Sequence, residues 1–232
     1  MGGQACVLYG AAEFSRDTDF AILASPGNLA RLRATLEDLR ADLIAVPPFE
    51  TRYLRKGHAI HFRCRHPECA GMRIDVMTKM RGVAPLPKLW SRRTSMVLEN
   101  DVLCEVMSLF DLVQAKKTQG DKDWPMIRRL TEVHYFVNRE HAMREQIHFC
   151  LQELRTPALL IELVANRKLP TRLTLKRPLL KLAQQGKEME LTKALFDEER
   201  MEREADRKYW TPLKAELEEL RHSRRRSSTI PG

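Results

Sequence analysis

Two aspartates separated by one residue, Asp17 and Asp19, begin an apolar run, and a third, Asp75, lies within a later one. Acids at positions i and i+2 of a strand point to the same face, so Asp17 and Asp19 can share one or two divalent ions. A carboxylate from a neighbouring strand would complete an oxygen cage suited to Mg²⁺, with positions left open for phosphate oxygens. Two such ions stabilise the attacking and leaving oxygens of an in-line displacement. The three acids therefore predict a phosphoryl-transfer site.

A glycine pair, Gly2-Gly3, precedes these acids and opens a short run, residues 4–14, that we expect to be helical. Because glycine has no Cβ atom, backbone N–H groups and a helix N-terminus can approach a triphosphate closely. The pair therefore predicts the phosphate-binding half of the same site.

Hydropathy patterning predicts the elements that carry the acids. Residues 17–23 alternate at first and then become continuously apolar, which is typical of a strand with one end at a site and the other in the core. Asn28 can cap a helix whose leucines recur at helical spacing as far as Leu43. Two extended runs, 53–64 and 72–77, follow, and we expect them to form an antiparallel pair.

Asp75 is a charge in the middle of one of these apolar strands. Strand alternation places Asp75 on the same face as Arg73 and opposite to Ile74 and Val76. Unpaired burial of a carboxylate is costly, so Asp75 either faces a site or has a cationic partner.

From Ser108 onward the sequence is helical almost throughout. Ser108 and Asp111 resemble a capping box, and Asp123 is expected to cap the next helix. The further expected helices cover 126–137, 139–155, 157–167, 177–185 and 187–222, the last with a kink or break at Pro212. The whole pattern predicts an α+β fold that ends in a helical region.

Composition bounds the class of protein and of partner. The 232 residues carry a formal charge of +9, which favours polyanions such as nucleotides or RNA. No window is apolar enough to span a membrane, no secretory signal is evident, and five scattered cysteines suit reduced thiols. We expect a cytoplasmic protein without a membrane partner.

Histidine and cysteine side chains gather between the second and third acids. A zinc site is conceivable on Cys64, His66 and Cys69, but alternation puts His58 and His61 on opposite faces and the spacing fits no usual zinc pattern. Ordinary strand and loop roles are therefore the preferred interpretation.

The order of these motifs resembles that of the nucleotidyltransferase superfamily, whose fold is that of DNA polymerase beta. Its signature is a Gly-Gly or Gly-Ser turn, a spacer, Asp-x-Asp and a distant third acid. The stretch GGQACVLYGAAEFSRDTDFAIL is similar to the minimal, toxin-type branch, including AbiEii-type and AbiGii-type abortive-infection toxins. The segment SLFDLVQAKKTQGDKDWPMIRRL resembles their helices after the core, so the resemblance covers about residues 1–135.

The resemblance implies roles for particular residues. Gly2 and Gly3 would cradle the triphosphate of an NTP, while Asp17 and Asp19 would bind metal ions. Asp75 would hold a second Mg²⁺ and orient or deprotonate the attacking hydroxyl. Further implied nucleotide contacts come from Ser15, Arg16, Lys116 and Lys117, the lysines by neutralising developing charge.

The resemblance also implies an architecture. It implies a nucleotidyltransferase-type mixed sheet flanked by helices over residues 1–106. The patterning predicts a mostly helical region over 107–222, and the basic composition predicts a disordered tail over 223–232. The family places a strand before the glycine pair, whereas only Met1 precedes it here. We expect that this chain starts downstream of its natural start.

The function implied is Mg²⁺-dependent transfer of an NMP from an NTP to a hydroxyl of a macromolecule, either tRNA or protein. The toxin-type branch implies a toxin–antitoxin or phage-defence role with an antitoxin protein as partner. Two alternatives stay open: a small-molecule, aminoglycoside-like acceptor, and a non-catalytic binding protein on the same fold.

Overall fold

The computed structural model describes residues 1–165 and 167–228, and its fold is α+β. The chain divides into two compact units. The first unit comprises Met1–Leu8, Ala12–Ala115 and the chain from Arg207 onward; the second comprises Tyr9–Ala11 and Lys116–Asp206. This division differs from the expected one, because the first unit continues beyond residue 106 and takes up the C-terminal part of the chain.

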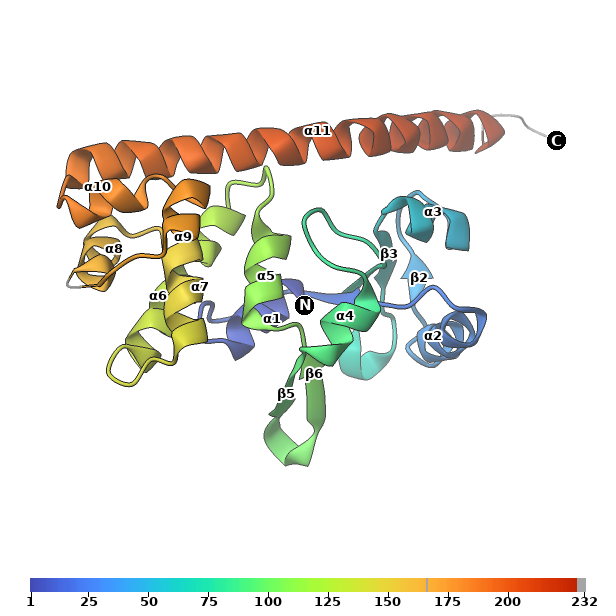
Figure 1. The fold of residues 1–232 in the computed structure, drawn as a ribbon. Helices are drawn as coiled ribbons and strands as arrows, with labels where there is room; N and C mark the ends of the chain where they lie inside the picture. The colour runs from blue at the N-terminus through green and yellow to red at the C-terminus, as the bar shows by residue number, and fades with distance from the viewer. Residues whose placement is uncertain (166, 229–232) are drawn as a thin grey trace. The chain divides into compact units, whose positions relative to one another are not determined.

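A four-stranded mixed sheet forms the centre of the first unit (Figure 1). Its strands stand in the order β1 (Asp17–Ala21), β4 (Arg73–Met77), β3 (Ile60–Arg63) and β2 (Asp42–Leu43). β1 and β4 are parallel, and the other neighbours are antiparallel. The expected antiparallel pairing of the two runs that became β3 and β4 is thereby confirmed.

Helices α2 (Pro26–Asp38) and α3 (Thr51–Lys56) pack against one face of this sheet. Buried apolar side chains make that core: Leu29, Leu36, Leu54, Ile60, Phe62, Cys64, Ile74 and Val76. Because strand side chains alternate between faces, the charged residues of β1 and β4 are left on the opposite face.

Three local expectations in this region were wrong. Residues 53–56, expected to be extended, belong to helix α3, which ends where Gly57 takes a φ of +111° and the chain reverses into β3. Ser25, not Asn28, caps α2, its hydroxyl accepting from the Asn28 backbone N–H at 3.4 Å. Helix α1 (Gly2–Leu8) is shorter than expected, since Gly10 turns the chain with a φ of +74°.

After β4 the chain of the first unit continues through α4 (Leu86–Ser91), a hairpin and α5 (Leu109–Lys116) (Figure 1). The patterning did not predict the hairpin. It consists of β5 (Thr94–Val97), the 3₁₀ turn η2 (Glu99–Asp101) and β6 (Leu103–Val106); a second 3₁₀ turn, η1 (Pro67–Cys69), joins β3 to β4. Half of the expected capping box is present: Ser108 Oγ accepts from the Asp111 backbone N–H at 3.3 Å, while Asp111 Oδ2 accepts from the Ser108 hydroxyl at 2.7 Å.

The second unit is helical. It contains α6 (Asp123–Asn138), α7 (Arg144–Glu153), α8 (Pro157–Val164), α9 (Thr171–Lys176), α10 (Leu180–Gln184) and the first half of α11 (Glu188–Ser228). Helix α11 runs through Pro212 without the expected break. Residues 223–228, expected in a disordered tail, belong to this helix, and 229–232 lie outside the described residues. None of the helices that the structure describes is long and apolar enough to cross a membrane.

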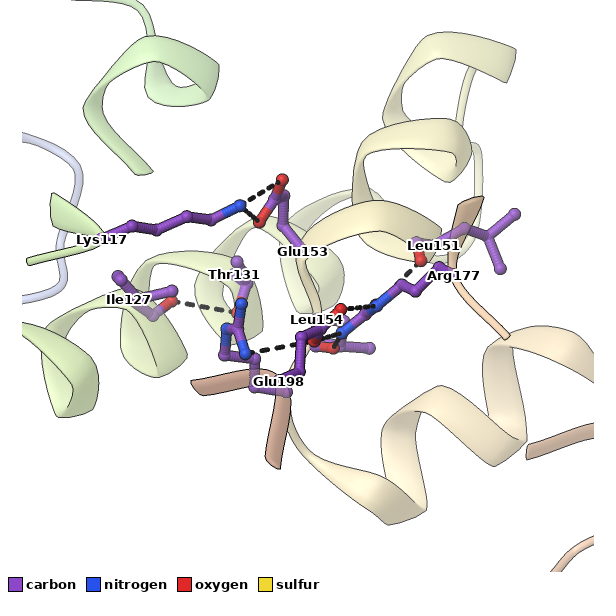
Figure 2. A network of polar contacts seen from close by, with 9 residues as sticks. Lys117, Ile127, Thr131, Leu151, Glu153, Leu154, Arg177 and Glu198 are labelled. Atoms are coloured by element: carbon purple, nitrogen blue, oxygen red, sulfur yellow. Dashed lines mark hydrogen bonds and ion pairs between the residues drawn. The ribbon is translucent and has the colours of Figure 1, made fainter. Parts of the chain in front are cut away.

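A network of ion pairs ties α11 to the other helices of the second unit (Figure 2). Arg177 donates to both carboxylate oxygens of Glu198, at 3.1 and 2.9 Å, and also to the Leu151 and Leu154 carbonyls. Arg155 donates to the same carboxylate at 3.2 Å. Burial raises the pKa of Glu198, but the neighbouring guanidinium groups lower it by more than burial raises it. The net pKa of Glu198 therefore lies below its usual range.

Candidate functional site

The predicted acids meet on one face of the sheet. In the parallel β1–β4 pair, Asp19 is the register partner of Asp75 and Asp17 is the partner of Arg73. Neighbouring strands are about 4.8 Å apart, and residues in register point to the same side. Asp17, Asp19 and Asp75 therefore lie together on the face opposite to the apolar core; we call this the carboxylate face.

The glycine pair packs directly against this face. Gly2 has a φ of +66°, and a Cβ atom there would lie 1.8 Å from Asp19 Oδ2. A Cβ atom on Gly3 would lie 2.3 Å from the Ser15 hydroxyl. The Gly3 N–H donates to Asp19 Oδ2 at 3.4 Å, and the Met1 amino group donates to the Asp19 carbonyl at 2.8 Å. Any larger residue at either glycine would displace groups of the candidate site.

Ser15 and Arg16 lead from this contact into β1. Ser15 Oγ donates to the Asp17 carbonyl at 2.9 Å, and Gln4 Nε2 donates to the Ser15 carbonyl at 3.1 Å. These bonds tie α1 to the start of β1. Arg16 is exposed. A contact between either residue and a phosphate stays a prediction.

Asp75 is buried, and its charge is compensated by two side chains. Arg73 Nε donates to Oδ1 at 2.8 Å and Arg73 Nη2 donates to Oδ2 at 3.0 Å, a bidentate pair. His61 Nδ1, on the neighbouring strand, lies 2.8 Å from Oδ1. Arg73 Nη2 lies 3.0 Å from the same His61 Nδ1, so the three side chains form one cluster. Asp75 thus has the cationic partner that its position in an apolar strand required.

The pKa directions agree with this arrangement. Burial raises the pKa of Asp75, but the hydrogen bonds from His61 and Arg73 lower it more, and the net pKa lies below its usual range. The hydrogen bond to Asp75 raises the pKa of Arg73. The pair is therefore ionised at neutral pH.

Of the three acids on the carboxylate face, only two are suited to bind a divalent ion. Asp17 and Asp19 offer hard oxygen ligands of the kind that Mg²⁺ prefers, and both are half-buried. In the part of the chain that the structure describes, no three or more His, Cys, Asp or Glu side chains are grouped to hold a metal ion. Both oxygens of Asp75 accept or share hydrogen bonds with Arg73 and His61. On this face Asp17 and Asp19 are therefore the residues that would hold an ion, whereas both oxygens of Asp75 are engaged by Arg73 and His61.

The two predicted lysines belong to the other compact unit. Lys116 Nζ donates to Asp123 Oδ1 at 2.8 Å, and Lys117 Nζ donates to Glu153 Oε1 at 3.0 Å. The structure therefore gives each lysine a carboxylate partner within the second unit. Their role toward a nucleotide stays a prediction.

The histidine and cysteine cluster divides among separate contacts. His58 is buried with its Nε2 2.8 Å from Glu216 Oε2, whereas His61 contacts Asp75. Burial, together with a hydrogen bond to Cys69, raises the pKa of the Cys64 thiol. His66 Nδ1 accepts from a backbone N–H of the η1 turn at 3.4 Å. Each side chain thus has a local structural contact.

Sequence reasoning did not identify Arg73 and His61 as part of the site. A signal for Arg73 was present, because it stands two residues before Asp75 on the same strand face. His61 becomes a neighbour of Asp75 only through the β3–β4 register. That register depends on the length of the connecting loop.

Comparison of the sequence with models of known protein families and with curated proteins gives no match. Similarity to a relative therefore contributes nothing to the assignment. What the site can do has to be argued from its own residues and geometry.

Proposed function

We propose that this protein is a Mg²⁺-dependent nucleotidyltransferase of the polymerase-beta-type fold, which transfers an NMP from an NTP to a hydroxyl of a macromolecular acceptor. One observation carries the proposal: Asp19 and Asp75 are register partners in parallel strands, with Gly2 against Asp19. Acids from two strands beside a closely approaching glycine backbone suit a site for a metal-bound triphosphate.

Asp17, Asp19 and the glycine pair would each serve one part of the reaction. Asp17 and Asp19 would hold Mg²⁺, which when bound neutralises charge on phosphate oxygens. The backbone at Gly2 and Gly3 would lie against the triphosphate. In the transfer itself, the acceptor hydroxyl oxygen bonds to the α-phosphorus as the bond to pyrophosphate breaks, and the hydroxyl proton is lost to water.

A macromolecular acceptor agrees better with the charges than a small cationic one. The chain carries a formal charge of +9, which favours an acceptor such as tRNA or an acidic protein. An open cleft of about 680 Å³ lies beyond the carboxyl ends of β1 and β4. Its described lining residues are mostly apolar and include Arg55 and Lys79 but no carboxylate. An aminoglycoside-like acceptor bound in this cleft would find no carboxylate among these residues to pair with its ammonium groups. A toxin opposed by an antitoxin protein is compatible with this activity.

The activity is tested by incubating the protein with each α-labelled NTP, Mg²⁺, and either total tRNA or a cell lysate. We expect label to transfer to a macromolecule, and the variant Asp17→Asn/Asp19→Asn to lose the transfer. Asp38→Asn is the matched control, since it removes an exposed carboxylate from the same unit. Equal labelling by the double variant and the control would remove the proposal.

A second candidate is a non-catalytic binding protein on the same fold. The observation that favours it is the engagement of both Asp75 oxygens by Arg73 and His61. Titration calorimetry distinguishes the two, because the non-catalytic candidate predicts no binding of Mg-NTP. Mg-dependent heat from any of the four NTPs would argue against it.

A further inference from the structure

Arg73 and Asp75 form a built-in ion pair on the carboxylate face. They stand two residues apart on β4, so their side chains share one face. The guanidinium group meets both carboxylate oxygens, through Nε at 2.8 Å and Nη2 at 3.0 Å. A bidentate fork of this kind is the strongest geometry for an arginine–carboxylate pair. The pair is thus a fixed part of the site.

The ion pair stands where a second divalent ion would have to bind. A two-metal site needs a third carboxylate whose oxygens are open to the ion. Here Arg73 and His61 Nδ1 lie within hydrogen-bond distance of the Asp75 oxygens. The positive charge of the Arg73 guanidinium group repels a further cation at Asp75. Asp17, the register partner of Arg73, also attracts the guanidinium group electrostatically. The positive charge is therefore already present before any metal ion arrives.

We propose that Arg73 takes the place of the second metal ion, so that the site binds one divalent ion, at Asp17 and Asp19, and presents a guanidinium group to the nucleotide phosphates. The Arg73 side chain is 36% exposed, and its Nη1 has no hydrogen-bond acceptor among residues 1–165 and 167–228. Planar guanidinium groups bind phosphate oxygens through such N–H donors. Asp75 then acts as a positioning residue that holds Arg73 in place.

Because this inference rests on the proposed function, its test counts bound ions separately from bound nucleotide. Purified protein is dialysed to equilibrium against Mn²⁺ and the non-hydrolysable analogue α,β-methylene-ATP. Bound Mn²⁺ and bound analogue are then measured per chain. We expect about one Mn²⁺ ion per chain for the wild type and about two, a twofold rise, for Arg73→Gln, because this variant frees Asp75.

Arg63→Gln is the matched control. Arg63 lies on β3 as the register partner of Arg73, and it is exposed. The Arg63→Gln variant loses one positive charge on the neighbouring strand β3, as Arg73→Gln does on β4, but leaves the Arg73–Asp75 ion pair in place. We expect this variant to bind about one Mn²⁺ ion, as the wild type does.

The possible results separate the inference from the proposed function. Two Mn²⁺ ions on the wild type, or one on folded Arg73→Gln, would overturn the role of Arg73 and leave the transferase proposal standing. Neither Mn²⁺ nor analogue on the wild type would overturn both. A wild-type count of two overturns the inference even if Arg73→Gln fails to fold.

Discussion

Asp19 and Asp75 are register partners in adjacent parallel strands, although 55 residues of intervening chain, Phe20–Ile74, separate them. The two carboxylates share the sheet face opposite to the apolar core, and Gly2 packs against the first of them. This relationship brings residues from three separate segments to one place. The first prediction concerns the glycine that allows it.

Replacing Gly2 with alanine should disturb Asp19 directly. The new Cβ atom would lie 1.8 Å from Asp19 Oδ2, a distance that forces the carboxylate to move. We expect a lower melting temperature and a Mn²⁺ affinity reduced by about tenfold or more, since a displaced ligand no longer matches the ion. Both are measured on the purified variant.

Gly82→Ala is the control for this prediction. Gly82 has a φ of +70°, close to the +66° of Gly2, but its added Cβ atom would meet nothing within 4 Å. It therefore carries only the backbone strain of a left-handed residue, about 1–2 kcal/mol. Equal Mn²⁺ affinities for the two variants would contradict the proposed contact.

Part of this arrangement could be predicted from the sequence. Alternation along residues 72–77 placed Asp75 on the polar side of its strand, and the Ser108–Asp111 spacing predicted the bond from the Asp111 backbone N–H to Ser108 Oγ, because both depend on neighbours along the chain. The alternation argument also required that a buried Asp75 have a cationic partner or face a site. Arg73 supplies that partner.

Other parts depend on distant contacts that no local pattern encodes. Residues 53–56 have extended-type composition but form α3, because Tyr53 and Leu54 pack into the core in a helical turn that Gly57 ends. His61 becomes a partner of Asp75 only through cross-strand register. The part of α11 that begins at Arg207 belongs to the first unit, and this depends on contacts with residues far away in the sequence.

Removing the Glu216 carboxylate should destabilise the first unit. Glu216 accepts from Lys56 Nζ at 2.5 Å and lies 2.8 Å from Nε2 of the buried His58. Glu216→Ala would leave that ring nitrogen without its partner, at a cost of about 1–3 kcal/mol. Urea denaturation measures the loss, and Glu219→Ala, at an exposed position of the same helix, should cost far less. Equal losses would show that the His58 contact contributes nothing.

The ion-pair network of the second unit should make stability depend on pH. The pKa of Glu198 is lower in the folded chain than in an unfolded one, since Arg177 and Arg155 outweigh the effect of burial. A group with a lowered pKa stabilises the fold above its unfolded pKa, about 4.3 for glutamate, and loses that contribution as the pH falls through its folded pKa. The network in Figure 2 should therefore weaken in acid.

Glu198→Gln tests this dependence. We expect the variant to be about 3 kcal/mol less stable than the wild type at pH 7, because two buried arginines lose their shared carboxylate. The difference should shrink as the pH is lowered from 5 to 3 in urea titrations. Glu190→Gln, an exposed change on the same helix, serves as the comparison. A difference that stays constant with pH would contradict the assigned role of Glu198.

The most direct test of the central claim is titration calorimetry of α,β-methylene-ATP into the protein, with Mg²⁺ and with EDTA. If the carboxylate face holds a metal-bound triphosphate, binding should require Mg²⁺ and should weaken by about a hundredfold or more in Asp19→Asn. Asp38→Asn, an exposed change in the same unit, should bind as the wild type does. Binding that is equally tight in EDTA, or unchanged in Asp19→Asn, would contradict the account.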